Sequence, residues 1–404
     1  MTIIHWFVIQ ILHGNSSLQH VSLLANRAFT DAAYCLARAR LPLAVFRGVL
    51  RGLVQALVPQ TRSEDTWRGH RTWLIDGSSV SMPDTPALQA EFGQPESQAK
   101  GCGFPVAKIL ALFHAGTGLL FEVAAAPYRT HEMSRLDEVH PAFEPGDVLV
   151  GDRGFCSFAH LAMLVRGGFH AVFRAHQRQI IDFTPRRPHF RPEQPKAGKG
   201  LPRSRWLRRL GVTDQVVEWF KPEERPGWMS IEEYKELPET LVVRELRYRT
   251  GGRGFRTRSV TLVTTLVDGE IYPPESLAEL YGMRWRVELN FRHLKTTMKM
   301  DVLKCKTVDG VLKELTMFAI VYNLVRVVML EAARRQDVAV ERISFVDALR
   351  WLEQAEPGDD LVKLVVNPDR PNRFEPRMRK RRPKSYPLMT KPRSELRKAL
   401  LDQV

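Results

Sequence analysis

Cysteine is scarce in this sequence, and the positions of the cysteines argue against both zinc sites and disulfide bonds as structural cross-links. The 404 residues contain four cysteines, and none stands at the short spacing that zinc sites or disulfide frameworks use. They are Cys35, Cys102, Cys156 and Cys305. We therefore expect neither a structural zinc ion nor disulfide bonds, and we expect a cytoplasmic location.

Long uninterrupted apolar runs are also missing. The most apolar windows, "LPLAVFRGVLRGLVQALV" and "LTMFAIVYNLVRVVML", are broken by Arg47, Arg51 and Arg326, short of the roughly 20 apolar residues that a membrane span needs. The opening "MTIIHWFVIQ" has no basic lead of the kind found in secretory signals. We expect buried helices here and no membrane partner.

Acidic residues are in deficit. Lys and Arg number 60 against 45 Asp and Glu, which gives a formal net charge of +15 and a pI near 9.9. An excess of this size indicates an anionic partner, and nucleic acid is the first candidate.

The pattern of apolar residues predicts an α/β protein with a mixed sheet. Residues 1–65 have helical spacing, and the strand-like runs "TWLID", "VAKILALFH" and "LLFEVAAA" follow, the last two joined by the hairpin signal "HAGTG". "VLVGD" is a further buried strand, which a helix and another strand follow. This order is typical of an α/β layout.

The second half of the chain departs from that order. A basic, proline-rich loop precedes "QVVEWF", "TLVVRELRYRT" and "RSVTLVTTL", which alternate like antiparallel strands. Helices follow from "YPPES" onward, and a basic tail rich in proline covers residues 370–398. We predict five segments: a helical region 1–65, a first core part 66–176, a β-rich insertion 177–258, a second core part 259–336 and a helical, basic region 337–404.

One helical stretch, "YGMRWRVELNFRHLKTTMKM" over residues 281–300, carries a single carboxylate among cations. At about 100° per residue, Tyr281, Arg284, Glu288 and Lys295 fall within an arc of about 60°, and Lys299 lies close to the same face. An apolar stripe on another face predicts burial. Such a polar face is also typical of a solvated helix.

Two distant aspartates bear on the role of Glu288. Asp76 closes "TWLID" and Asp152 closes "VLVGD", and ligands of open α/β sheets lie at the carboxyl ends of strands. An aspartate at a strand end is also a common turn former. If the three carboxylates converge, they need a counter-charge, and oxygen ligands favour Mg²⁺ or Mn²⁺. Two such ions would support phosphoryl transfer on a nucleic acid.

These residues resemble a known family. "LIDGSS", "VGDRGF" and the spacing Tyr281, two residues, Arg284, three residues, Glu288, six residues, Lys295 are similar to the DDE transposases of bacterial insertion sequences that carry the Y-(2)-R-(3)-E-(6)-K signature. The resemblance spans residues 66–336.

The resemblance implies an RNase H-like core interrupted by the β-rich insertion, with Asp76, Asp152 and Glu288 as catalytic metal ligands for two Mg²⁺ or Mn²⁺ ions. It also implies DNA cleavage, hairpin formation and strand transfer by a homodimer bound to DNA near the bacterial nucleoid. Tyr281, Arg284 and Lys295 would bind DNA phosphates, and the helical projection adds Lys299.

Other features stay open at this level. Trp219, Phe220 and Trp228 are candidates to stack on a flipped base, although each is also a normal core or hairpin aromatic. The helical region before the core is shorter than in many relatives, which suggests a shortened DNA-end-binding domain. A non-catalytic DNA-binding remnant and an RNase H-like nuclease unconnected with transposition remain alternatives. A glycosidase with paired carboxylates fits the basic charge poorly.

Overall fold

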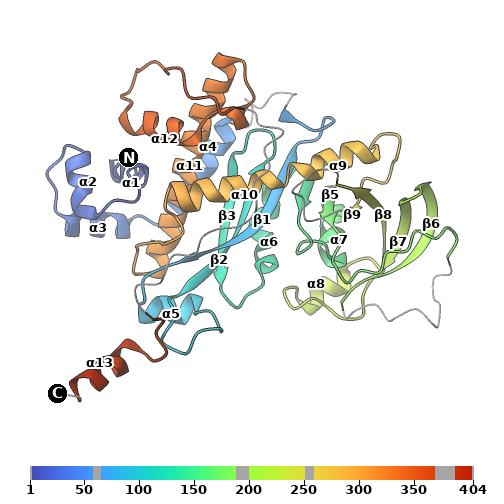
Figure 1. Cartoon of the computed structure of the whole chain (residues 1–404), viewed down its shortest axis with the longest axis horizontal. Coiled ribbons are helices and arrows are strands. Elements are labelled where there is room, and N and C mark those ends of the chain that lie inside the picture. Colours follow the sequence, from blue (N-terminus) through green and yellow to red (C-terminus); the bar gives the residue numbers. More distant parts are fainter. Residues whose placement is uncertain (1, 58–64, 188–199, 251–258, 369–386, 403–404) are drawn as a thin grey trace.

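A single mixed sheet of nine strands organises the protein, in the order β3-β2-β1-β4-β5-β9-β8-β7-β6 (Figure 1). The computed structural model describes residues 2–57, 65–187, 200–250, 259–368 and 387–402. The strands are β1 Thr72–Ser81, β2 Val106–His114, β3 Leu120–Pro127, β4 Val148–Gly151, β5 His170–Arg174, β6 Arg203–Gly211, β7 Asp214–Phe220, β8 Thr240–Arg249 and β9 Ser259–Thr264. Strands β1, β4 and β5 are parallel, and the other pairings are antiparallel. The predicted α/β class with a mixed sheet is confirmed.

The strand that carries Asp76 is longer than the sequence indicated. We expected it to end at Asp76, but β1 continues to Ser81 because β2 pairs with it along this whole length. On its other side the parallel partner β4 stops at Gly151, opposite Ile75. Asp76 therefore lies in mid-strand, at the point where one neighbour of β1 ends.

The hairpin between β2 and β3 provides the hydrogen-bond acceptor for Arg326, an arginine in an otherwise apolar helix. Gly118 has a positive φ of 70° in this turn, a conformation that favours glycine. Arg326 of the long helix α11 (Val308–Gln336) is buried and donates through Nε to the carbonyl oxygen of Thr117 over 3.0 Å. The helix is long and apolar enough to cross a membrane, but most of that apolar stretch is buried inside the protein.

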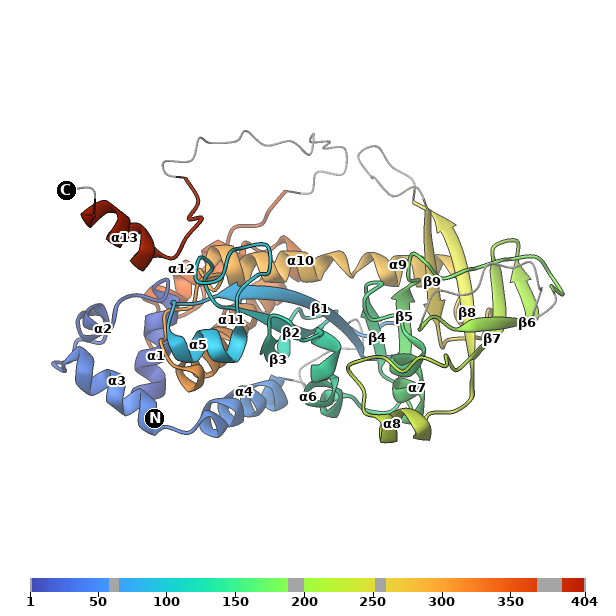
Figure 2. The same ribbon diagram turned by 90° about the horizontal axis from the view of Figure 1, so that it is seen from below.

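The helical N-terminal region packs against this long helix (Figure 2). It consists of α1 Thr2–Leu12, α2 Leu18–Leu24, α3 Asp31–Arg40 and α4 Leu43–Leu57. Helix α4 buries Phe46, Leu50 and Val54 at helical spacing, which is the arrangement its amphipathic sequence predicts. The buried carboxylate of Glu314 on α11 accepts a hydrogen bond from Asn15 over 2.6 Å, so the region is also tied to the core by a polar contact.

The remaining helices complete the fold. They are α5 Pro86–Phe92, α6 Leu136–Val139, α7 Phe158–Arg166, α8 Ile231–Glu236, α9 Pro274–Gly282, α10 Trp285–Arg292, α12 Phe345–Gln354 and α13 Arg393–Leu401, with 3-10 turns at Glu132–Arg135, His140–Ala142 and Val340–Arg342. A π-helical turn, His293–Thr297, follows α10. Much of the basic loop and most of the basic tail lie outside the described residues.

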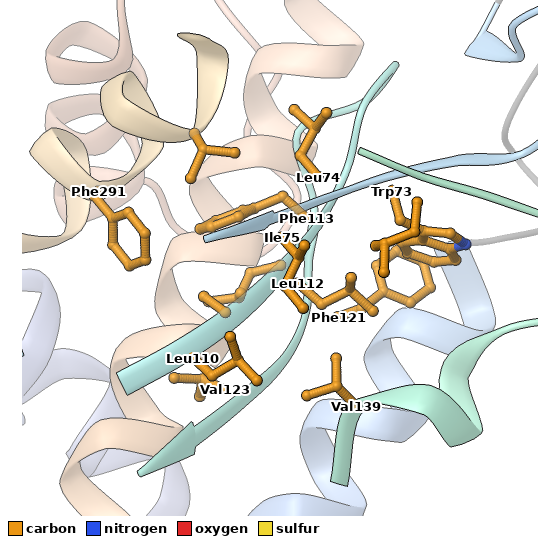
Figure 3. Packing of buried hydrophobic residues seen from close by; sticks show 14 of the residues in the cluster. Trp73, Leu74, Ile75, Leu110, Leu112, Phe113, Phe121, Val123, Val139 and Phe291 are labelled. Carbon is orange, nitrogen blue, oxygen red and sulfur yellow. The ribbon is translucent and has the colours of Figure 1, made fainter. Parts of the chain in front are cut away.

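Aromatic contacts bury both faces of the sheet around β1 and β2 (Figure 3). On one face Phe291 of α10 meets Phe113 edge to face, with ring centroids 5.6 Å apart. Trp73 of β1 packs against Phe121 with centroids 4.2 Å apart. The helix that carries Glu288 is therefore anchored to the strand pair that carries Asp76.

Candidate active site

Sheet register brings the two predicted aspartates side by side. The last paired residues of β1 and β4 are Ile75 and Gly151, so Asp76 and Asp152 are the next residues on neighbouring parallel strands. The backbone orients both side chains. Oδ1 of Asp76 accepts from the Gly77 N–H over 2.8 Å, and Oδ1 of Asp152 accepts from the Gly154 N–H over 2.7 Å.

A third charged residue belongs to the same row. Strands β4 and β5 pair Gly151 with Phe173, which puts Arg174 opposite Asp152 in the next position. Because parallel strands in register direct side chains to the same face, Asp76, Asp152 and Arg174 form one row across three strands. Arg174 was not predicted from the sequence, since only the register between two strands reveals its position.

Glu288 reaches this row through Arg284. One tight turn joins α9 and α10, with the Arg284 N–H bonded to the Tyr281 carbonyl over 3.1 Å. This turn aims the guanidinium at the sheet. Its Nη1 lies 3.5 Å from Oδ2 of Asp76, and its Nη2 lies 3.0 Å from Oε1 of Glu288. Arg284 thus bridges the acid of β1 and the acid of the helix.

Tyr281 is buried beside the same groups instead of facing solvent. Its side chain is 9% exposed, and burial raises the pKa of its hydroxyl, while the nearby Arg284 and Arg174 oppose this shift and Asp152 adds to it. The hydroxyl therefore stays protonated at neutral pH and can donate a hydrogen bond.

The side chain of Lys295, from the π-helical turn, contacts β1 near the aspartate row. Its Nζ donates to Oγ of Ser78 over 3.2 Å. Ser78 is two residues beyond Asp76 and so on the same face of the strand. Burial lowers the pKa of Lys295. Tyr281, Arg284, Glu288 and Lys295 are thus gathered along one side of the sheet, as the helical projection predicted.

The extension of that projection to Lys299 was wrong in its geometry. The helix changes to a π-helical turn at His293 and ends after Thr297, and Lys299 has a left-handed φ of 66°. Its side chain lies against Gly14 of the N-terminal region. A contact between Lys299 and DNA remains a prediction.

The aspartate row carries excess negative charge. Burial raises the pKa of Asp76 to about 6, and Asp152 and Glu288 add to the shift, while the Gly77 N–H and Arg284 oppose it. Within the part of the chain that the structure describes, no three His, Cys, Asp or Glu side chains are close enough to hold one metal ion. The two aspartates still offer the oxygen donors that Mg²⁺ prefers, and Arg284 supplies the counter-charge between Asp76 and Glu288.

Comparison with known proteins decides the family. The family model described as "Transposase DDE domain" matches residues 67–324, more than half of the chain and the whole of the site above. This chain belongs to the DDE transposases. Members of this family cleave DNA and transfer its strands.

Two curated relatives come from Escherichia coli (strain K12). The transposase is 25% identical over 401 residues to "Transposase InsG for insertion sequence element IS4", covering 94% of this chain and 83% of that protein. It is 30% identical over 113 residues to "Putative transposase InsZ", which covers 28% of this chain and 36% of that protein. Among solved structures, a piggyBac transposase synaptic complex with hairpin DNA aligns with a TM-score of 0.37 and 10% identity, over 70% of this chain and 51% of that chain.

The aromatic candidates of the insertion differ in accessibility. Trp219 of the transposase is 1% exposed, and its Nε1 donates to the buried carboxylate of Glu245 over 3.0 Å. Such a residue is a core side chain and is not free to stack on a base. Phe220 and Trp228 are half-buried, so the question of base stacking is reduced to these two.

Proposed function

We propose that this transposase uses Asp76, Asp152 and Glu288 to cut DNA at the ends of an insertion sequence. Cleavage would be followed by hairpin formation, hairpin opening and strand transfer into a target. The observation that carries the proposal is the row of Asp76 and Asp152 on adjacent parallel strands, with Glu288 linked to it through Arg284. The strand order β3-β2-β1-β4-β5 supports an RNase H-like core.

The acids would hold the Mg²⁺ or Mn²⁺ ions that the family uses. When bound, two such ions lower the pKa of an attacking hydroxyl and stabilise the charge on the leaving oxygen. Asp76 and Asp152, with Glu288 beside them, suit this role because cations relieve the repulsion between neighbouring carboxylates. In the structure described here Arg284 provides part of that relief.

The neighbouring groups would position the DNA. Tyr281 keeps its proton and can donate a hydrogen bond to a phosphate oxygen. The guanidinium of Arg284 can form a bidentate pair with a phosphate. The ammonium group of Lys295, which donates to Ser78 near the aspartates, would bind a further phosphate. Lys299 would act farther along the DNA, near Gly14. A homodimer would bind the two ends of the element together, in the bacterial nucleoid.

The test uses a duplex that carries one end of the element and the purified full chain with Mg²⁺, with Mn²⁺ or with EDTA. Denaturing gels separate nicked, hairpin and strand-transfer products. We expect all three products with metal and none in EDTA, and we expect Glu288→Gln to abolish them while DNA binding persists.

Glu279→Gln is the matched control, because Glu279 is an exposed glutamate on α9. This variant should cut like the wild type. If the Glu288→Gln variant still cut DNA, Glu288 would not be a catalytic residue. Absence of cleavage by the wild type would favour the non-catalytic remnant, and cleavage without hairpin or transfer products would favour a simple nuclease.

A further inference from the structure

Basic side chains gather on the two loops that follow β4 and β5, beside Asp152. Arg153 comes directly after Asp152, and Arg174 ends β5. His176 and Arg178 follow within four residues. None of these four side chains belongs to the helix of Tyr281 and Lys295, and the function proposed above gives them no role.

Specific contacts hold the two loops together. Nη1 of Arg153 donates to Oε1 of Gln177 over 2.8 Å, which joins the first loop to the second. Nδ1 of His176 accepts from the Arg178 N–H over 3.2 Å, so the imidazole is ordered within its loop. Burial lowers the pKa of His176, and the charges of Arg178 and Arg153 lower it further, which places both guanidinium groups within electrostatic reach of the ring.

The ion pairing of these arginines differs from that of Arg284. In the described part of the chain, no ion pair with Asp or Glu involves Arg153, Arg174 or Arg178, whereas Arg284 pairs with Asp76 and Glu288, and Arg244 pairs with Asp214. The charge of Arg174 instead acts on the hydroxyls of Tyr281 and Tyr248 and opposes the rise in their pKa that burial causes. Neighbouring cations that form no ion pair repel one another, and an anion relieves that repulsion.

The position of the cluster indicates which anion. Neighbouring strands are about 4.8 Å apart, so Arg174 on β5 lies about 10 Å along the row from Asp76 on β1. Lys295 lies at the β1 side of the row, on Ser78, and the arginines lie at the β5 side. A DNA strand that crosses from β5 to β1 would have cations on both sides of the acids. Guanidinium groups bind phosphate oxygens in a two-pronged geometry.

We propose that Arg153, Arg174 and Arg178 form a second phosphate-binding site, which holds the DNA backbone on the side of Asp152 away from Lys295. This site rests on the proposed function and extends it. The DNA would be gripped at two places, with the cleaved bond between them.

The experiment measures binding of the full chain to an element-end duplex at several salt concentrations in EDTA. Each phosphate contact contributes about 0.9 to the slope of log affinity against log salt. In the triple variant Arg153→Gln, Arg174→Gln, Arg178→Gln, the magnitude of that slope should fall by about two to three. The matching triple lysine variant should recover most of the loss. Arg350→Gln, an exposed residue of α12, should leave the slope unchanged.

A folded triple glutamine variant with the wild-type slope would overturn the inference. Thermal melting checks the fold, and the double variant at Arg153 and Arg178 replaces the triple variant if Arg174→Gln unfolds the protein. The double variant should lose about one to two from the slope, and a wild-type slope would again refute the site. If the wild type cuts DNA with Mg²⁺ but the variants keep the slope, the second phosphate site fails and the proposed function stands. If the wild type does not cut, the proposed function fails whatever the slopes.

Discussion

Replacing Asp76 with asparagine should make the metal-free transposase more stable at alkaline pH. The pKa of Asp76 is about 6 in the folded chain, against 3.8 for the unperturbed group. The folded state therefore binds the proton more tightly than the unfolded state. Above pH 6 the ionised carboxylate destabilises the fold, and this penalty fades as the pH falls toward 4.

The expected size follows from the two pKa values. Their difference corresponds to about 3 kcal/mol at pH 8, a value that already includes the attraction of Arg284. By the same linkage, the destabilisation that the Asp76 carboxylate causes falls to about 1.5 kcal/mol at pH 5 and about 0.5 kcal/mol at pH 4. Asparagine keeps the oxygen that accepts the Gly77 N–H, so no backbone contact is lost.

Urea unfolding in EDTA at pH 8, 5 and 4 measures the effect. The free energy of unfolding of Asp76→Asn should exceed that of the wild type by up to about 3 kcal/mol at pH 8. This gain should shrink as the pH falls. Addition of Mn²⁺ should stabilise the wild type more than the variant. A variant that is no more stable than the wild type at pH 8, or a gain that does not change with pH, would refute the view that Asp76 is ionised at a free-energy cost.

Three further changes probe the surroundings of the row. Lys295→Ala should lower the salt slope of DNA binding by about one, and an unchanged slope would exclude a phosphate contact. Arg284→Gln should raise Mn²⁺ affinity without DNA by about tenfold, or about 1.4 kcal/mol, measured by calorimetry. Equal affinity would show that Arg284 does not compete with metal. Arg244→Leu should lower the free energy of unfolding by about 3 to 5 kcal/mol, because it leaves Asp214 buried and unpaired. The double variant that also carries Asp214→Leu should recover part of this loss, and a neutral single variant would contradict the argument.

The sequence was a good guide to the elements and to the face of the helix. Apolar alternation predicted eight of the nine strands that the structure describes, and the stripe of Val287, Phe291 and Leu294 is buried as expected. Strand β6 was missed, because Arg203–Gly211 lies largely in the basic stretch that we interpreted as a loop. Pattern alone did not reveal where strands end. Asp76 precedes glycine and serines, which look like a turn in one dimension, but pairing with β2 keeps these residues extended.

Helical projection worked over short distances and failed over longer ones. Tyr281, Arg284 and Lys295 reach the same side of the sheet although a tight turn and a π-helical turn lie between α9 and the end of the helix. A tight turn advances the side chain by more than 100° per residue and a π turn by less, so the two errors partly cancel at Lys295. At Lys299 the helix has ended, and the projection no longer applies.

The buried pair of Arg244 and Asp214 changes the meaning of the insertion. The sequence predicted a β-rich insertion, and its strands β6, β7 and β8 continue the sheet that carries the aspartate row. Arg244 of β8 donates to Asp214 of β7 over 2.8 Å and to the carbonyl oxygen of Tyr272 over 2.7 Å. Tyr272 lies just before α9, the helix that carries Tyr281. The buried guanidinium of Arg244 therefore ties two strands of the insertion to the segment that leads into the helix of Tyr281.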